Sequence, residues 1–306
     1  MERIIIDCDP GHDDAVALAM ARGLSDKIKV EAIIATCGNQ SIDKTLTNAL
    51  NLAQALKYDA PVYTGSLRPL IRERVAAGYI HGENGLAGPV FPPCTRYCNG
   101  NGITTALDLV INNPGEITFV SVGPFTDLAV CIKADPRFAK SLKRIVVMGG
   151  AINRSGNVTP SAEFNVYADP EAAQIVFNSG VDVVMFGLDV TLQLTLSDEI
   201  IENVKKMPAT SYTPIFLAAM ECYVAACKKY VHDYPSMHDP CTIAYLADPS
   251  IFEFERRSVQ VDCKSELNYG RTVAAFPNGE GNVLVGVKAN KEKFWSLFYE
   301  ALSRLP

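Results

Sequence analysis

Residues 3–18 read RIIIDCDPGHDDAVAL, and this stretch indicates how the whole chain is built. The apolar run from Arg3 to Cys8 predicts a buried strand. A Pro-Gly turn follows, and a helix is predicted from about Asp13. A buried strand that leads through a tight turn into a helix is the first half of a βαβ unit.

The same alternation continues along the chain. Further apolar runs lie at 30–37, 116–122, 144–149 and 181–187, and helices are predicted from about Asp43 and from Pro124. Continuously apolar strands that alternate with helices are typical of a parallel sheet covered on both faces. We therefore predict an α/β fold with a mainly parallel, helix-flanked central sheet and a Rossmann-like core.

Composition favours one large domain. The chain has 306 residues, of which 48% are hydrophobic and 20% charged, so it is too apolar to be disordered. No repeat or change of composition divides it, and residues 1–306 are predicted to form a single domain. Two stretches interrupt the alternation: a segment rich in Gly, Pro and Cys at 68–102, interpreted as a flap that carries His81, and a helical segment at 211–238, which leads to another helix starting near Asp239.

Several classes of partner are excluded by composition. Every apolar run is far shorter than the roughly 20 residues that span a bilayer, so no membrane segment is expected. The net charge is −6 with scattered Lys and Arg, which disfavours nucleic acid. The nine cysteines are odd in number and form no CxxC pair, and the first residues do not resemble an export signal. Free thiols in a reducing cytoplasm are expected.

The acidic residues in DCDPGHDD, at 7–14, are the densest chemical signal. Asp7 and Asp9 are predicted to lie on the same side of the strand, with Asp13 and Asp14 at the start of the helix. Four carboxylates in one place would repel one another unless a cation lies between them, and all-oxygen ligands favour calcium or magnesium. The alternative is that Asp13 only caps the helix and Asp7 pairs with a lysine.

A second signal is NVTPSAEFN, at 157–165. Glu163 and Asn165 are predicted to alternate on an extended segment and to face one way, with Asn157 a turn away. Amide and carboxylate groups together can donate to and accept from the vicinal hydroxyls of a sugar. The alternative is an exposed edge with scattered polar residues.

Other candidates are weaker alone. His238 and Asp239 precede a helix, where an Asp also serves as a cap. Cys8 is interpreted as a small core residue, because it alternates away from the neighbouring aspartates. The segment VGPFTD, at 122–127, lacks the lysine of a phosphate-binding loop, and a main-chain oxygen there is expected to face the cation.

Taken together, these motifs resemble the inosine-uridine nucleoside hydrolase family over practically the whole chain and in the family's order. The motifs that carry the resemblance are DCDPGHDDAVAL at the start, CGNQ at 37–40, IHGENGL at 80–86, VGPFTDLA at 122–129, VMGGA followed by GNVTPSAEFNVYADPEAA, and HDP at 238–240.

The resemblance implies hydrolysis of the N-glycosidic bond of ribonucleosides, giving ribose and free base, with a bound Ca²⁺. It implies metal ligands at the carboxylates of Asp9, Asp14 and Asp239 and the main-chain oxygen of Val122. The same motifs imply ribose contacts from Asp13, Asn39, Asn157, Glu163 and Asn165, with Met148 and Phe164 nearby, and a base site bordered by His81 and His238.

Roles in the reaction follow from the resemblance too. Asp9 would be the general base, and His238 is the candidate acid because the unperturbed pKa of histidine lies near working pH. Tyr223 and Tyr230 are candidates for stacking on the base, and Tyr230 is assigned to the site; the alternative is that these tyrosines only pack a helix. The base preference is expected to be for uridine and cytidine or broad, including inosine. A homo-oligomer, dimer or tetramer, and a part in nucleoside salvage are also expected.

Two positions depart from the family pattern that we expect. Asp127 stands where many relatives have Asn, and His12 where many have an aliphatic residue. Two alternative functions remain at this point. One is a magnesium-dependent phosphohydrolase of the haloacid-dehalogenase type, which also places DxD after its first strand. The other is a non-catalytic nucleoside-binding protein with the same pocket.

Overall fold

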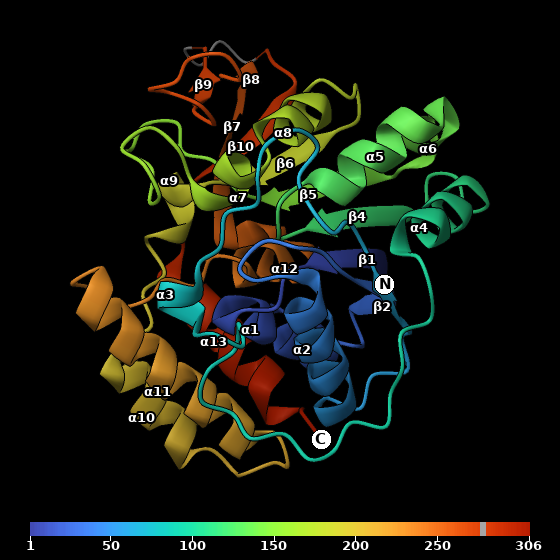
Figure 1. The fold of residues 1–306 in the computed structure, drawn as a ribbon. Coiled ribbons are helices and arrows are strands. Elements are labelled where there is room, and N and C mark those ends of the chain that lie inside the picture. Colours follow the sequence, from blue (N-terminus) through green and yellow to red (C-terminus); the bar gives the residue numbers. More distant parts are fainter. Residues whose placement is uncertain (276–279) are drawn as a thin grey trace.

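The computed structural model describes residues 1–275 and 280–306, and Figure 1 shows a central sheet between two layers of helices. The sheet has the strand order β3-β2-β1-β4-β5-β6-β10-β7, and every neighbouring pair is parallel except β10 and β7. Its strands are β1 (Glu2–Cys8), β2 (Ile28–Ala35), β3 (Val62–Thr64), β4 (Ile117–Ser121), β5 (Arg144–Met148), β6 (Val183–Phe186), β7 (Phe252–Arg257) and β10 (Val283–Ala289). A separate antiparallel pair joins β8 (Val259–Val261) to β9 (Thr272–Ala274).

Two apolar cores lie on the two faces of the sheet, because side chains alternate along each strand. Ile4, Ile6 and Cys8 of β1 belong to one core, and Ile5 belongs to the other. The first core is covered by α1 (His12–Gly23), α2 (Ile42–Ala55), α11 (Thr213–Tyr230), α12 (Pro240–Ala247) and α13 (Lys291–Ser303). The second is covered by α4 (Gly102–Ile111), α5 (Thr126–Ala134), α6 (Pro136–Ser141) and α8 (Pro170–Phe177).

Short elements complete the fold. They are α3 (Gly78–His81), α7 (Phe164–Ala168), α9 (Leu188–Thr191), α10 (Asp198–Lys206) and a 3₁₀ turn at Pro249–Ile251. The segment 68–102 contains α3, and its later part is attached to the body of the protein. Arg96 donates to the main-chain oxygens of Tyr58 and Ala60, and Gln54 donates to the main-chain oxygen of Pro93 at 3.0 Å.

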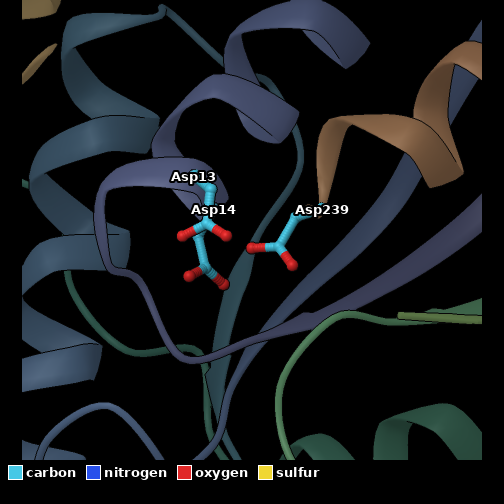
Figure 2. Close-up of side chains that lie close together, drawn as sticks. All are labelled: Asp13, Asp14 and Asp239. Carbon is cyan, nitrogen blue, oxygen red and sulfur yellow. The ribbon is translucent and has the colours of Figure 1, made fainter. Parts of the chain in front are cut away.

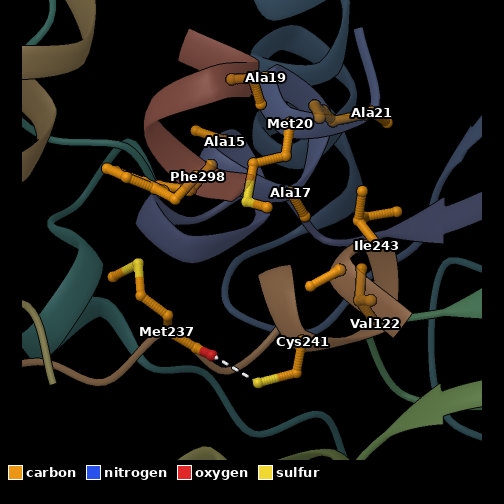
Figure 3. Close-up of a cluster of buried hydrophobic side chains, with 14 of the residues drawn as sticks. Ala15, Ala17, Ala19, Met20, Ala21, Val122, Met237, Cys241, Ile243 and Phe298 are labelled. Atoms are coloured by element: carbon orange, nitrogen blue, oxygen red, sulfur yellow. Dashed lines mark hydrogen bonds between the residues drawn. The ribbon is translucent and has the colours of Figure 1, made fainter. Parts of the chain in front are cut away.

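Helix α1 is buried on nearly every side. Figure 3 shows its alanines and Met20 packed beside Phe298 of α13 and Ile243 of α12. The small alanine side chains let these helices approach one another closely. At the start of α12, the Cys241 thiol donates to the main-chain oxygen of Met237 at 3.1 Å. These contacts fix the positions of the starts of α1 and α12.

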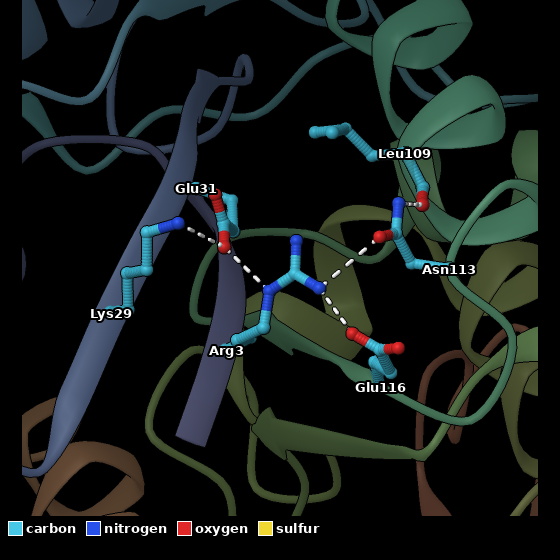
Figure 4. A network of polar contacts seen from close by, with 6 residues as sticks. All are labelled: Arg3, Lys29, Glu31, Leu109, Asn113 and Glu116. Carbon is cyan, nitrogen blue, oxygen red and sulfur yellow. Dashed lines mark hydrogen bonds and ion pairs between the residues drawn. The ribbon is translucent and has the colours of Figure 1, made fainter. Parts of the chain in front are cut away.

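A polar network lies at the amino-terminal ends of the strands, on the opposite side of the sheet from the polar motifs (Figure 4). Arg3 of β1 donates to Glu31 of β2 at 2.6 Å, to Asn113 at 3.1 Å and to Glu116. Lys29 also pairs with Glu31, at 2.9 Å. The network links β1, β2 and the turn before β4, the three strands whose other ends carry the polar motifs.

The predicted α/β architecture is confirmed, and so is the role of Cys8 as a core residue. The five predicted strands correspond to β1, β2, β4, β5 and β6, whereas β3 and β7 to β10 were not predicted. The helix predicted from Pro124 begins at Thr126, and the long helix predicted within 211–238 is α11. Among the described residues, no helix combines the length and hydropathy that crossing a membrane requires.

Candidate active site

A cavity of about 490 Å³ opens at the carboxyl ends of the parallel strands. It lies where the strand order reverses, between β1 and β4, the place where α/β sheets bind ligands. Most of the residues predicted for the site line it: Asp9, Asp13, Asn39, His81, Val122, Met148, Asn157, Glu163, Phe164, Asn165, His238 and Asp239. Segments far apart in the sequence thus meet at one cavity.

Three carboxylates converge beside the cavity. Asp13 and Asp14 come from the first turn of α1, Asp239 comes from the residue before α12, and Figure 2 shows the three side chains close together. Each offers an oxygen within 4.8 Å of the others, and all three residues are buried. Burial, followed by the charges of Asp13 and Asp14, raises the pKa of Asp239 well above its usual value. A hard divalent cation would offset these charges, and the donors are the oxygen atoms that such a cation prefers.

Asp14 also caps α1. Its Oδ2 accepts the main-chain N–H of Gly11 at 2.9 Å, and its Oδ1 accepts that of Asp9 at 3.1 Å. The capping alternative considered for Asp13 therefore applies to Asp14 instead. The Asp14 carboxylate accepts hydrogen bonds at the start of α1 and also belongs to the acidic cluster. The start of the helix therefore fixes the position of the cluster.

Asp9 lies beside the cluster, but it is not one of the three carboxylates within 4.8 Å of one another. Its Oδ2 accepts the main-chain N–H of Asn39 at 2.6 Å. Two glycines make room for it, because a Cβ at Gly38 would lie 2.0 Å from Oδ2 and one at Gly123 would lie 2.9 Å from Oδ1. The glycines of the CGNQ and VGPFTD motifs thus permit the close approach of the Asp9 carboxylate to two strand ends.

Asp7 does not join the cluster, so the prediction that four carboxylates of DCDPGHDD converge is wrong for this residue. Its Oδ2 accepts from the Ser121 hydroxyl at 3.2 Å, and it faces Asp127 rather than the cavity or a lysine. The other oxygen of Asp7 and the Oδ2 of Asp127 are buried, and a proton shared between the two carboxyls supplies the hydrogen bond that these oxygens lack when both residues are ionised. Burial, and then the charge of Asp127, raises the pKa of Asp7 well above its usual value. Burial likewise raises the pKa of Asp127.

Asp127→Asn is expected to stabilise the protein by about 1–3 kcal/mol at neutral pH, because an amide can donate to the Asp7 carboxylate without either side chain taking up a proton. A carboxyl whose folded-state pKa is raised loses stability as pH rises from its ordinary value through the raised one. The wild-type melting temperature should therefore fall with rising pH in that window more steeply than that of the variant. Differential scanning calorimetry of both proteins between pH 4 and 8 measures this, and parallel curves would contradict it.

Glu163 and Asn165 both line the cavity, as predicted, but the backbone conformation predicted for them is wrong. The segment is not extended: Glu163 caps α7, and Asn165 lies within that helix. Glu163 accepts main-chain N–H groups from Gly150 at 2.8 Å, Asn165 at 2.9 Å and Val166 at 3.1 Å. These donors fix the carboxylate at the helix start, where negative charge is favourable.

The side chain of Asn165 is oriented by the strand ends. Its Nδ2 donates to the main-chain oxygens of Val122 at 2.7 Å and Met148 at 3.1 Å. Asn157 accepts the main-chain N–H of Phe164 at 2.9 Å. The main-chain oxygen of Val122, expected to face a cation, therefore already accepts one hydrogen bond and keeps a second lone pair.

His81 and His238 form the other side of the cavity. Nδ1 of His238 lies 2.9 Å from the Thr191 hydroxyl, which leaves Nε2 for a ligand. Burial lowers the pKa of His238 to about 4, which favours the neutral imidazole and does not support the near-neutral pKa on which its role as acid was based.

Tyr230 does not line the cavity, contrary to prediction. It is 48% exposed at the end of α11, with its ring 6.0 Å from that of Tyr79, whereas Tyr223, the other candidate, lines the cavity at 4% exposed. The sequence interpretation also did not single out several lining residues: Tyr79, Ile80, Leu192, Cys227, Asp233 and Tyr234. Tyr79 and Ile80 directly precede His81, a position that could have indicated them.

Comparison with known proteins identifies the family of the chain. The family model "Inosine-uridine preferring nucleoside hydrolase" matches residues 4–296. The chain belongs to this family. It is 39% identical over 308 aligned residues to the pyrimidine-specific ribonucleoside hydrolase RihB of Escherichia coli O1:K1 and of Escherichia fergusonii, covering 98% of this chain and 96% of each relative.

Solved nucleoside hydrolases have the same fold. The plant nucleoside hydrolase PpNRh1 superposes with a TM-score of 0.90 at 31% identity, covering 99% of both chains. The purine-preferring ribonucleoside hydrolase from Gardnerella vaginalis gives 0.92 at 28% identity, covering 99% of this chain and 98% of that one. The nucleoside hydrolase described here is therefore an N-glycosyl hydrolase of ribonucleosides, and the phosphohydrolase and non-catalytic alternatives are set aside.

Proposed function

We propose that this nucleoside hydrolase cleaves pyrimidine ribonucleosides with the help of a bound Ca²⁺. The observation that carries the proposal is a cavity with acidic, oxygen-rich walls on one side and rings on the other. The oxygen-only donors of Asp13, Asp14 and Asp239 support a hard cation. Likeness to a relative described as pyrimidine-specific supports the choice of base.

On the acidic side, we assign the ribose. Asp13, Asn39, Asn157, Glu163 and Asn165 all line this part of the cavity and offer both donors and acceptors. Buried Glu163, held by three main-chain donors, places negative charge where positive charge develops on the sugar ring as the C1′–N bond breaks.

The metal ligands in this proposal are Asp9, Asp14, Asp239 and the main-chain oxygen of Val122, with the Asp13 carboxylate beside them. A bound Ca²⁺ would supply positive charge next to the sugar and would act there as a Lewis acid. Asp9 accepts a proton from the attacking water as the oxygen of that water bonds to C1′. Its hydrogen bond from Asn39 and the two adjacent glycines keep the carboxylate in one orientation.

On the other side, the base lies between His81, Tyr223 and His238. The bonding electrons of the C1′–N bond leave with the base, which then needs a hydrogen bond or a proton. With Nδ1 of His238 at the Thr191 hydroxyl, Nε2 is the nitrogen that remains to contact the base. A neutral imidazole that donates this N–H stabilises the departing negative charge.

The activity test uses the purified protein with uridine, cytidine, inosine and adenosine, and measures the ribose released. We expect the fastest release from uridine and cytidine. Release from 2′-deoxyuridine should be slower by at least about 100-fold, because one of the two hydroxyls that position the sugar is missing. Equal rates on uridine and deoxyuridine would contradict the assignment of the ribose side, and fastest release from inosine would contradict the base preference.

Assembly as a dimer or tetramer and a cytoplasmic location remain predictions. All nine cysteines are unpaired in the structure.

A further inference from the structure

His12 occupies a position that the proposed reaction has not used. It is the first residue of α1, it is fully buried, and it does not line the cavity. Its ring nevertheless lies directly behind the rings of Tyr223 and His81, which line the cavity. The centroids of His12 and Tyr223 are 4.9 Å apart with planes 8° from parallel, and those of His12 and His81 are 5.2 Å apart at 25°.

Both nitrogens of the His12 ring are engaged. Nε2 lies 2.9 Å from the main-chain oxygen of Ala87, and Nδ1 lies 3.0 Å from Nδ1 of His81. A carbonyl only accepts, so Nε2 of His12 carries a hydrogen in the first contact. Ala87 in turn donates its main-chain N–H to the main-chain oxygen of His81 at 2.9 Å. His12 is thereby connected to α3 through both the ring and the backbone.

His81 is held at one edge of its ring only. Its Nδ1 receives the main-chain N–H of His12 at 3.2 Å in addition to the ring contact. Because Nδ1 is turned toward α1, Nε2 is the polar atom that His81 offers to a molecule in the cavity. Acceptance of the main-chain N–H of His12 uses the lone pair of Nδ1, so in the neutral imidazole of His81 the hydrogen lies on Nε2, where it can be donated to a molecule in the cavity.

We infer that His12 is a positioning residue, which turns Nε2 of His81 toward the departing base and keeps it there. The inference rests on the proposed function, because it assigns the base to the side of the cavity that His81 lines. Tyr223 stacks on the ring of His12 and completes its orientation. The ribose side does not depend on this arrangement, because none of the contacts of the His12 ring involves a residue assigned to the sugar.

The test compares two substrates with the same sugar. The base that leaves uridine needs a hydrogen bond or a proton, whereas 4-nitrophenyl β-D-riboside releases a phenolate that is stable without either. His12→Leu should lower kcat/KM for uridine by about 10- to 100-fold, since a small misplacement of a reacting group has an effect of this size. The same variant should hydrolyse the nitrophenyl riboside nearly as fast as the wild type. His12→Asn, which can place a polar atom near the position of Nδ1, should recover part of the loss.

A double variant shows whether His12 acts through His81. In a His81→Ala background, His12→Leu should cause no further loss on uridine, because the residue that it positions is already gone. A further loss there, an equal loss on both substrates, or no loss on uridine would each overturn the inference. The wild-type protein separates this from the proposed function: if it cleaves neither riboside, the proposed function is wrong, and if it cleaves both, the His12 variants judge the inference alone.

Discussion

Asp9→Asn is expected to lower kcat/KM for uridine by about 100- to 10,000-fold, the range over which a general base contributes to catalysis, while the protein stays folded. The carboxylate sits within the cavity and is oriented by the Asn39 N–H. An amide of nearly the same size fits between Gly38 and Gly123 but cannot accept the proton of the attacking water. The measurement is steady-state kinetics of ribose release, with circular dichroism to confirm folding.

Asp127→Asn is the matched control for this experiment. It makes the same chemical change at another fully buried carboxyl that follows a strand of the same sheet edge, but Asp127 does not line the cavity. We expect its kcat/KM for uridine to remain close to that of the wild type. An Asp9→Asn variant that remains as active as this control would contradict the assignment of Asp9 as base.

Chelation of the proposed cation should abolish activity and lower the melting temperature by roughly 10 °C. A ligand present at about 1,000 times its Kd stabilises the folded state by about 4 kcal/mol, and each kcal/mol corresponds to about 2–4 °C in a protein of this size class. The physical reason lies in the acidic cluster, where three buried carboxylates within 4.8 Å of one another repel without a counter-charge. Scanning calorimetry with EDTA, followed by addition of Ca²⁺ or Mg²⁺, measures the loss and its recovery.

Asp239→Asn tests whether the stabilisation arises at this cluster. Because the variant lacks one of the three converging carboxylates, its melting temperature should change much less than that of the wild type when EDTA is added. A wild-type melting temperature that is the same in EDTA and in Ca²⁺ would exclude a structural cation. A shift that persists unchanged in Asp239→Asn would place the cation elsewhere in the protein.

The central part of the fold was predictable because its strands are continuously apolar. β1, β4, β5 and β6 are each covered on both faces, so their sequences need no polar side. β7, with the sequence FEFERR, mixes charged and apolar residues because it lies at the edge of the sheet and several of its side chains reach solvent. Residues 252–257 show neither a continuous apolar run nor a regular alternation, so their sequence alone did not indicate a strand.

The site was predictable in its residues and less so in its geometry. Side chains alternate only while the chain is extended, and β1 ends at Cys8, so the orientation of Asp9 could not be inferred from that of Asp7. For the same reason, Glu163 and Asn165 were expected on a strand although they start a helix. Tyr223 and Tyr230 are both on α11, and only the folded structure shows that Tyr223 is buried at the cavity whereas Tyr230 is exposed outside it.

The two walls of the cavity come from different parts of the chain. Residues assigned to the sugar and the cation follow β1, β2, β4 and β5 or begin α1, α7 and α12, whereas the rings that face the base come chiefly from α3 and α11. Helices α3 and α11 lie outside the sheet, so their side chains can be exchanged without disturbing the strand ends. Substitutions on α3 and α11 can therefore alter the choice of nucleobase while the residues proposed to bind the sugar and to activate water stay in place.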